Sequence, residues 1–164
     1  FSEPLRLYES VVPPDWLDYN GHMNESRYLQ VFSDASDAIL HFIGMDEEYR
    51  SHDFSFYTVE THIRHLNEIG ASEPMMVETQ LLGFDEKRIR INHVMIHPPS
   101  GEMLATGEHM FLHVNTEKGR AVQMGRVIYE KLEKIWKGHQ NLKIPEYCGK
   151  GIMQLKTDGN KNTT

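Results

Sequence analysis

The chain has 164 residues and a mass of 19.1 kDa, a length that provides for one hydrophobic core and predicts a single domain over residues 1–164. Hydrophobic residues make up 39% of it, which excludes an intrinsically disordered chain. With 17 basic against 24 acidic residues the net charge is -7, so nucleic acids and anionic membranes are excluded as general partners.

The cysteine content and the chain's N-terminus bear on its compartment. A single cysteine, Cys148, excludes an internal disulfide framework and is typical of a reducing compartment. No apolar stretch approaches the roughly 20 residues that span a bilayer, and no basic segment followed by an apolar core opens the chain. We therefore expect a cytoplasmic protein. Because residue 1 is Phe rather than Met, we expect the chain to be either a trimmed form or a piece of a longer polypeptide.

The first predicted elements are a strand and a long helix. From Leu5 to Val12 apolar and polar residues roughly alternate, which predicts a strand, and Pro13-Pro14 ends it. From Glu25 to Ile43 apolar residues recur at spacings of three and four, which predicts one well-buried helix. Asn24 is a favoured N-cap residue, and Gly44 supplies the left-handed conformation that commonly ends a helix.

After Gly44 the pattern changes to a period of two. Four more strands are predicted, at Phe54–Leu66, Met75–Gly83, Lys87–His97 and Glu102–Asn115. The joint between the second and third of these strands is Asp85-Glu86, and that between the third and fourth is Pro98-Pro99-Ser100-Gly101. Both lengths favour antiparallel hairpins and a meander. A second helical pattern, with apolar residues from Val127 to Trp136, closes the core, and residues 156–164 form a polar, loosely held tail.

This order of elements predicts an α+β fold, in which an antiparallel sheet of about five strands wraps around one long central helix. A curved sheet of this size leaves unpaired edges. We therefore expect self-association, giving at least a dimer.

The loop before the long helix contains the candidate catalytic residues. The run from Asp18 to Asn24, Asp-Tyr-Asn-Gly-His-Met-Asn, sets a carboxylate in a glycine-bearing turn just before the helix starts at Glu25. A helix start has unpaired N–H groups and partial positive charge, so it can stabilise an oxyanion while a carboxylate attacks or activates water. The alternative is that Asp18 only caps its own turn.

Five residues of this segment form the pattern D-x-x-G-H-x-N-x-x-x-Y: Asp18, Gly21, His22, Asn24 and Tyr28. The pattern resembles the hotdog-fold acyl-CoA thioesterases of the 4-hydroxybenzoyl-CoA thioesterase type, and the order of elements extends the resemblance over about Leu5 to Val114. It implies a hotdog fold, an acyl-CoA substrate, and Asp18 as nucleophile or general base. It also implies that the backbone N–H of Glu25 polarises the thioester carbonyl, and that the site forms between subunits of a homodimer or homotetramer.

A longer string, from Pro13 to Glu25, is similar to the betainyl-CoA thioesterases, which occur alone or fused to carnitine dehydrogenase. This resemblance makes betainyl-CoA the expected substrate and association with a carnitine dehydrogenase an expectation. It calls for no cofactor.

Further site residues have two readings each. Asn24 acts as N-cap and sets the oxyanion geometry; His22 either gives a proton to the leaving thiolate or orders the loop. The candidate substrate contacts, each of which can instead be a turn or core residue, are Trp16, Tyr19, Gly21, Tyr28 and Tyr57. Phe54 and Phe56 are further aromatic candidates for holding a quaternary ammonium group. The candidate ligands of the CoA phosphates are Lys87, Arg88 and Arg90. The alternative is that these residues only form a charged turn exposed to solvent.

Other polar clusters are weaker candidates. Asp34 and Asp37 could supply a helix carboxylate, although a solvated helix face is the commoner use. Two histidine pairs share strand faces, His93 with His97 and His109 with His113, but the sequence has neither a clear third ligand nor a zinc cysteine pattern, so we predict no metal.

Two other functions fit the same fold. A hotdog enoyl-CoA hydratase has the signature D-x-N-P-x-H, but here the proline is absent and the spacing is one residue short. A non-catalytic acyl-CoA-binding protein would be expected to carry an effector or DNA-binding segment, and the sequence shows none.

Overall fold

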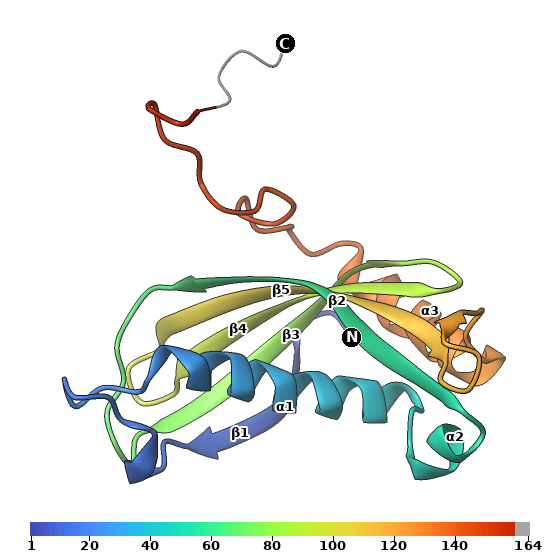
Figure 1. Cartoon of the computed structure of the whole chain (residues 1–164), viewed down its shortest axis with the longest axis horizontal. Helices are drawn as coiled ribbons and strands as arrows, with labels where there is room; N and C mark the ends of the chain where they lie inside the picture. Colours follow the sequence, from blue (N-terminus) through green and yellow to red (C-terminus); the bar gives the residue numbers. More distant parts are fainter. Residues whose placement is uncertain (160–164) are drawn as a thin grey trace.

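The structure is a computed structural model that describes residues 1–159. Its elements are β1 (Leu5–Val11), the 3-10 turn η1 (Pro14–Trp16), α1 (Glu25–Ile43), α2 (Glu47–Ser51), β2 (Phe54–His65), β3 (Pro74–Phe84), β4 (Arg88–His97), β5 (Glu102–Asn115), β6 (Arg120–Ala121) and α3 (Arg126–His139). The strands form a six-stranded sheet, and α1 runs along one of its faces (Figure 1). This arrangement confirms the expected α+β fold with a central helix.

Antiparallel pairing gives the sheet the order β1-β3-β4-β5-β2, with the short β6 beside β5. Strands β3 to β5 form the predicted meander. The first strand after α1 does not join it, because β2 pairs with β5 at the far edge, and residues 66–73 cross from there to β3. The crossing lies outside the predicted meander, and it brings the segment after β2 back to the start of α1.

The helix α1 has the predicted bounds. Asn24 caps its start, and at its end Gly44, with φ 121°, donates its N–H to Leu40 and His41 carbonyls. One face of α1 is buried against the sheet, where Phe32 and Ala35 are almost fully inaccessible to solvent. A 19-residue helix held along its length in this way fixes the position of its own first turn.

The core has two parts that meet under α1. One surrounds the end of α1 and includes Ile43, Phe111 and, from α3, Ile128 and Leu132. The other surrounds the start of α1 and contains Tyr28, Phe32 and Met75 among others. Val127 belongs to the predicted apolar pattern of α3, but its side chain is 75% exposed.

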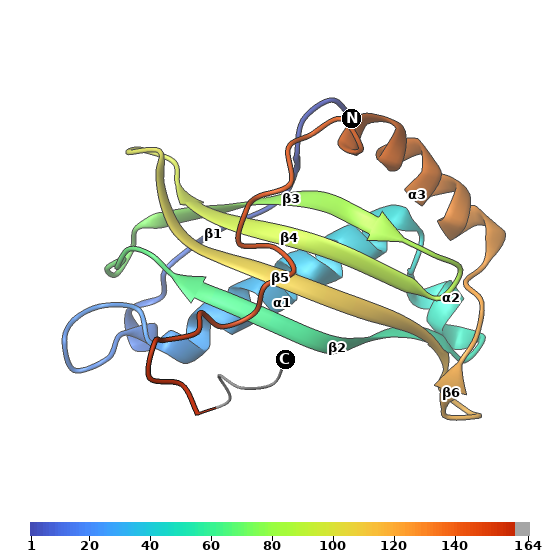
Figure 2. The same ribbon diagram turned by 90° about the horizontal axis from the view of Figure 1, so that it is seen from above.

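The segment after α3 crosses the sheet on the face opposite α1, as Figure 2 shows. We call residues 143–151 the C-terminal strap. Three sheet residues in matched register hold it: Gln80 donates to the Lys143 carbonyl (3.3 Å), Asn92 to the Tyr147 hydroxyl (2.8 Å), and Glu108 accepts from Gly149 N–H (2.8 Å). The predicted tail begins beyond the strap; residues 156–159 are exposed, and 160–164 lie outside the described residues.

Candidate active site

The loop from Asp18 to Asn24 is a tight, internally bonded turn. Asp18 N–H donates to the His22 carbonyl (2.8 Å), and Gly21, at φ 78°, donates to the Asp18 carbonyl (3.1 Å). The positive φ explains the glycine, because side chains with a Cβ rarely adopt it. Asp18 Oδ1 accepts from the N–H groups of Asn20 (2.8 Å) and His22 (3.3 Å). The carboxylate thus caps its own turn through Oδ1, while no donor in residues 1–159 bonds Oδ2.

The start of α1 adjoins this turn. Asn24 Oδ1 accepts from the Ser26 N–H (3.0 Å) and from the Ser26 hydroxyl (2.9 Å), which confirms the predicted N-cap. The N–H of Glu25 has no acceptor within the described part of the chain. A backbone donor at the positive end of a long helix is therefore free to bind an oxygen.

A second loop, residues 66–70 at the end of β2, packs on the first. Met23 N–H donates to the Ile69 carbonyl (2.8 Å), the Tyr28 hydroxyl to the Asn67 carbonyl (3.3 Å), and His22 Nδ1 lies 3.2 Å from Glu68 Oε2. His22 therefore joins the two loops, which supports its loop-ordering reading.

The two loops and the start of α1 enclose a cavity of about 370 Å³. Its lining is Asp18, Asn20, His22, Met23, Glu25, Tyr28, His65, Leu66, Asn67 and Glu68. We call it the motif cavity. A carboxylate with one unbonded oxygen and the first residue of α1 thus line the same space, which is open to solvent and accessible to a substrate.

Electrostatics in the motif cavity is dominated by carboxylates. Burial raises the pKa of the Tyr28 hydroxyl, and the charges of Glu68 and Asp18 raise it further. Both carboxylates therefore act on one point of the cavity wall. Its lining contains no lysine or arginine.

The other predicted substrate contacts do not line this cavity. The Arg27 guanidinium lies 5.1 Å from the ring centre of Trp16, so a cation of the protein already covers that ring. Tyr19 is 98% exposed at the tip of the turn. Tyr57 lies near the opposite end of β2 from His65, half-exposed on the sheet edge.

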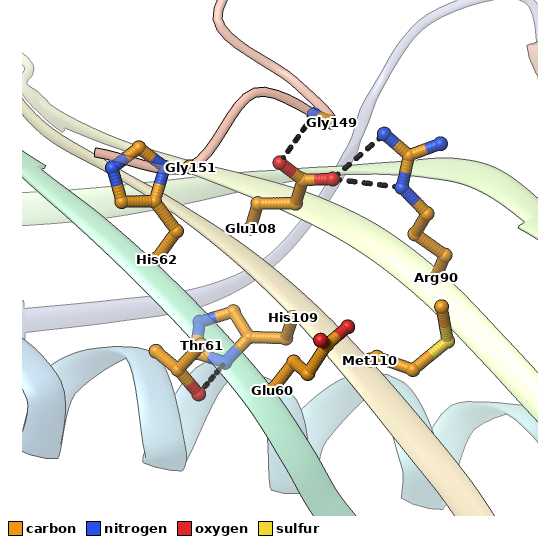
Figure 3. A pocket seen from close by; sticks show the side chains of 9 residues that line it. All are labelled: Glu60, Thr61, His62, Arg90, Glu108, His109, Met110, Gly149 and Gly151. Carbon is orange, nitrogen blue, oxygen red and sulfur yellow. Dashed lines mark hydrogen bonds and ion pairs between the residues drawn. The ribbon is translucent and has the colours of Figure 1, made fainter. Parts of the chain in front are cut away.

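The structure also places the predicted CoA ligands away from Asp18 within one chain. Arg88 pairs with Asp85 (2.6 Å) at the β3–β4 hairpin, in register with Leu112 and, through it, with Tyr57. Lys87 is an exposed neighbour in the same hairpin. Arg90 points to the outer face, where it pairs with Glu108 (2.7 Å) beside a second cavity of about 380 Å³ under the C-terminal strap (Figure 3).

The helix acids are likewise separate from the motif cavity. Asp34 accepts from the Tyr8 hydroxyl (3.2 Å). Asp37 lines a groove of about 750 Å³ between α1 and β2, together with Thr61 and His109; burial and the nearby Asp34 raise its pKa, and Arg50 lowers it.

The histidines of β4 and β5 are mostly core residues. His93 is fully buried and lies 3.0 Å from the Ser36 hydroxyl and 2.8 Å from the Thr79 hydroxyl. The His109 ring packs 5.1 Å from it, and burial lowers the pKa of both imidazoles, that of His109 to about 4. Within residues 1–159 no group of three or more His, Cys, Asp and Glu side chains could hold a metal ion.

Sequence reasoning considered His65 only as a possible ligand of the CoA phosphates, and it missed Asn67 and Glu68. They follow the end of a strand with no spacing relation to the motif, and only the crossing of β2 to the far sheet edge brings them to Asp18. No signal in a single sequence marks them.

An antiparallel sheet around a helix, with a carboxylate turn at the helix start, defines the hotdog thioesterase class. A sequence profile of the Thioesterase-like superfamily matches residues 12–132. The chain belongs to this superfamily. Among the described elements, no helix combines the length and the apolar character needed to cross a bilayer.

Curated relatives with more specific names also match the chain. The chain is 48% identical over 153 residues to an L-carnitine dehydrogenase/betainyl-CoA thioesterase of Agrobacterium fabrum, covering 93% of this chain and 31% of the relative. It is 39% identical to a betainyl-CoA thioesterase of Pseudomonas aeruginosa, covering 92% of this chain and 96% of the relative. The chain thus spans less than a third of the fused relative and nearly all of the stand-alone one.

Solved structures confirm the fold. A Pseudomonas putida KT2440 protein superposes with a TM-score of 0.81 at 34% identity, covering 93% of this chain and 97% of the other. A Staphylococcus aureus protein solved in complex with CoA superposes with a TM-score of 0.85 at 20% identity, covering 93% and 98%.

Proposed function

We propose that the chain hydrolyses a small acyl-CoA, betainyl-CoA, to the free acid and CoA. The observation that carries the proposal is that Asp18 and Glu25 line one solvent-open cavity at the start of α1. The names of the relatives in Agrobacterium fabrum and Pseudomonas aeruginosa support the choice of acyl group.

In the proposed reaction the thioester oxygen faces the unbonded N–H of Glu25, which stabilises the negative charge that develops on it. Asp18 Oδ2 then acts by one of two routes. It attacks the carbonyl carbon, expelling CoA thiolate and leaving an anhydride that water cleaves; or it takes a proton from water as the water adds, and the C–S bond breaks. Asn24 holds the first turn of α1 in place, and His22 holds the carboxylate loop against Glu68.

We also propose that two copies pair antiparallel through β2. This 12-residue strand is a sheet edge, and its Tyr57 and Val59 side chains are about half exposed. Tyr28 packs against His65, with ring centres 4.9 Å apart, so the start of α1 lies at the end of β2. Antiparallel pairing would therefore set Tyr57 and the Arg88 hairpin of the second copy beside the motif cavity of the first.

The reaction is tested by thiol release from betainyl-CoA. Asp18→Asn is expected to lower kcat by about 10²- to 10⁴-fold with little change in KM, because it removes the nucleophile or base and keeps the shape. The matched control is Asp15→Asn, an exposed neighbour in η1 that does not line the cavity. Unchanged turnover in Asp18→Asn, or an equal loss in the control, contradicts the mechanism.

The dimer is tested by sedimentation. Val59→Asp puts a charge on the β2 edge and is expected to give monomers, because an unpaired carboxylate would be desolvated between the strands. Val127→Asp, on the exposed face of α3, should leave the assembly unchanged. A Val59→Asp protein that sediments like the parent shows that another surface is used.

A further inference from the structure

Glu68 belongs to the motif cavity although it lies far from the motif in the sequence. It contacts His22 at 3.2 Å, and its loop is bonded to the motif through Met23 and Tyr28. The side chain is 75% exposed, so it reaches into the solvent-open part of the cavity. The mechanism assigns its carboxylate no chemical step.

The charges that line the cavity suggest a role for this carboxylate in binding a cation. Within one chain three acidic residues line the cavity, Asp18, Glu25 and Glu68, and the lining has no arginine or lysine; Arg88 of the proposed second copy is paired with its own Asp85. Two of the three carboxylates raise the pKa of the same Tyr28 hydroxyl, so their potentials add inside the cavity. Such a space favours a cationic acyl group and disfavours an anionic one.

The substrate proposed above restricts where its positive charge can be held. In a betainyl group one methylene separates the quaternary nitrogen from the thioester carbon. A substrate carbonyl positioned at Asp18 and Glu25 therefore holds its cation within the same cavity. Within one chain the aromatic rings do not provide this site, because Arg27 covers Trp16 and Tyr57 lies near the other end of β2; in the proposed pair, Tyr57 of the second copy would add an uncharged ring beside the cavity.

We propose that Glu68 is a specificity-determining residue whose carboxylate attracts the quaternary ammonium head of the acyl group. The inference rests on the proposed thioesterase function and adds the group that selects the substrate. The rings of His65 and Tyr28 border the same space. Because the carboxylate is exposed and screened by salt, its effect is modest and depends on ionic strength.

The experiment compares kcat/KM for betainyl-CoA and for 3,3-dimethylbutanoyl-CoA, in which carbon replaces the charged nitrogen. Glu68→Gln is expected to lower the value for betainyl-CoA by about three- to tenfold and to leave the neutral isostere within about twofold. Glu68→Asp keeps the charge and should retain most of the preference. Glu133→Gln, which removes an exposed carboxylate of α3 away from the cavity, should change neither value.

The outcomes separate the two proposals. An equal loss for both thioesters in Glu68→Gln means that Glu68 only positions His22, and no loss for either thioester means that it does not sense the charge; either result overturns the inference while hydrolysis stands. A parent protein that releases thiol from neither substrate overturns the proposed function, and the inference with it.

Discussion

At the scale of single residues, the sequence motif predicted that Asp18, the cap Asn24 and the N–H of Glu25 lie next to one another, because these three are close in the chain. Their geometry follows from rules of turns and helix starts that act over a few residues. Glu68 and Asn67 could not be predicted, since their proximity to Asp18 depends on a strand crossing. Tyr57 and the basic hairpin stay predictions, because one chain does not bring them to the motif cavity.

The cap offers a test that separates stability from catalysis. Asn24→Ala is expected to lower the free energy of unfolding by about 1 kcal/mol and also to lower kcat, because the first turn of α1 loses the group that fixes it. Asp46→Ala removes the corresponding cap of α2, whose Oδ1 accepts from Tyr49 N–H (2.8 Å). Asp46→Ala should lower the free energy of unfolding by a similar amount and leave kcat unchanged, and thermal unfolding together with thiol release measures both effects. If both variants keep full activity, the cap has no part in setting the oxyanion site.

At the scale of elements, periodicity predicted α1 with its bounds and each long strand within one or two residues. The partners of the strands were less accessible, because pairing depends on long-range packing rather than on local pattern. The edge position of β2 shows this. Its side chains from Tyr57 to Thr61 are all exposed, so they show no alternation of buried and exposed residues that would indicate which strand pairs with β2.

The packing of α1 on β5 depends on a glycine. A Cβ at Gly107 would lie 2.8 Å from Phe32 Cδ2 and 2.9 Å from His109 Nε2, both buried side chains. Gly107→Ala is therefore expected to lower the free energy of unfolding by about 1–3 kcal/mol in urea titrations. Gly83→Ala is the control, because its Cβ would meet nothing within 4 Å. Equal midpoints for the two variants would show that α1 shifts to accept the methyl group.

At the scale of the whole molecule, composition predicted a packed globule but not which polar groups it encloses. The histidines of β4 and β5 have the alternation of ordinary strand residues. Only the position of α1 decides that His93 and His109 are covered. Their burial makes the fold depend on pH.

Both imidazoles are buried in their neutral form, and burial lowers their pKa in the folded state, that of His109 from 6.5 to about 4. Between these values the unfolded chain binds a proton that the folded chain does not, so stability falls as the pH drops from about 6.5 to 4. The loss from His109 alone is roughly 3 kcal/mol. Urea unfolding at several pH values measures it.

His109→Asn is expected to make this profile less steep, because asparagine does not titrate, while the buried His93 keeps its own share of the pH dependence. The control is His52→Asn, which changes an exposed histidine at the end of α2 and should keep the parent slope. A His109→Asn profile as steep as the parent's would place the acid sensitivity elsewhere.

The C-terminal strap bears on how copies of the molecule can stack. It occupies the side of the sheet that α1 leaves bare, and it is fastened to three successive strands. A second molecule that approached from that direction would meet Tyr147 and the glycines at 149 and 151 rather than bare strands. Contact between the outer faces of two sheets would require displacement of the C-terminal strap. That displacement would break the hydrogen bonds that Asn92 and Glu108 make to it.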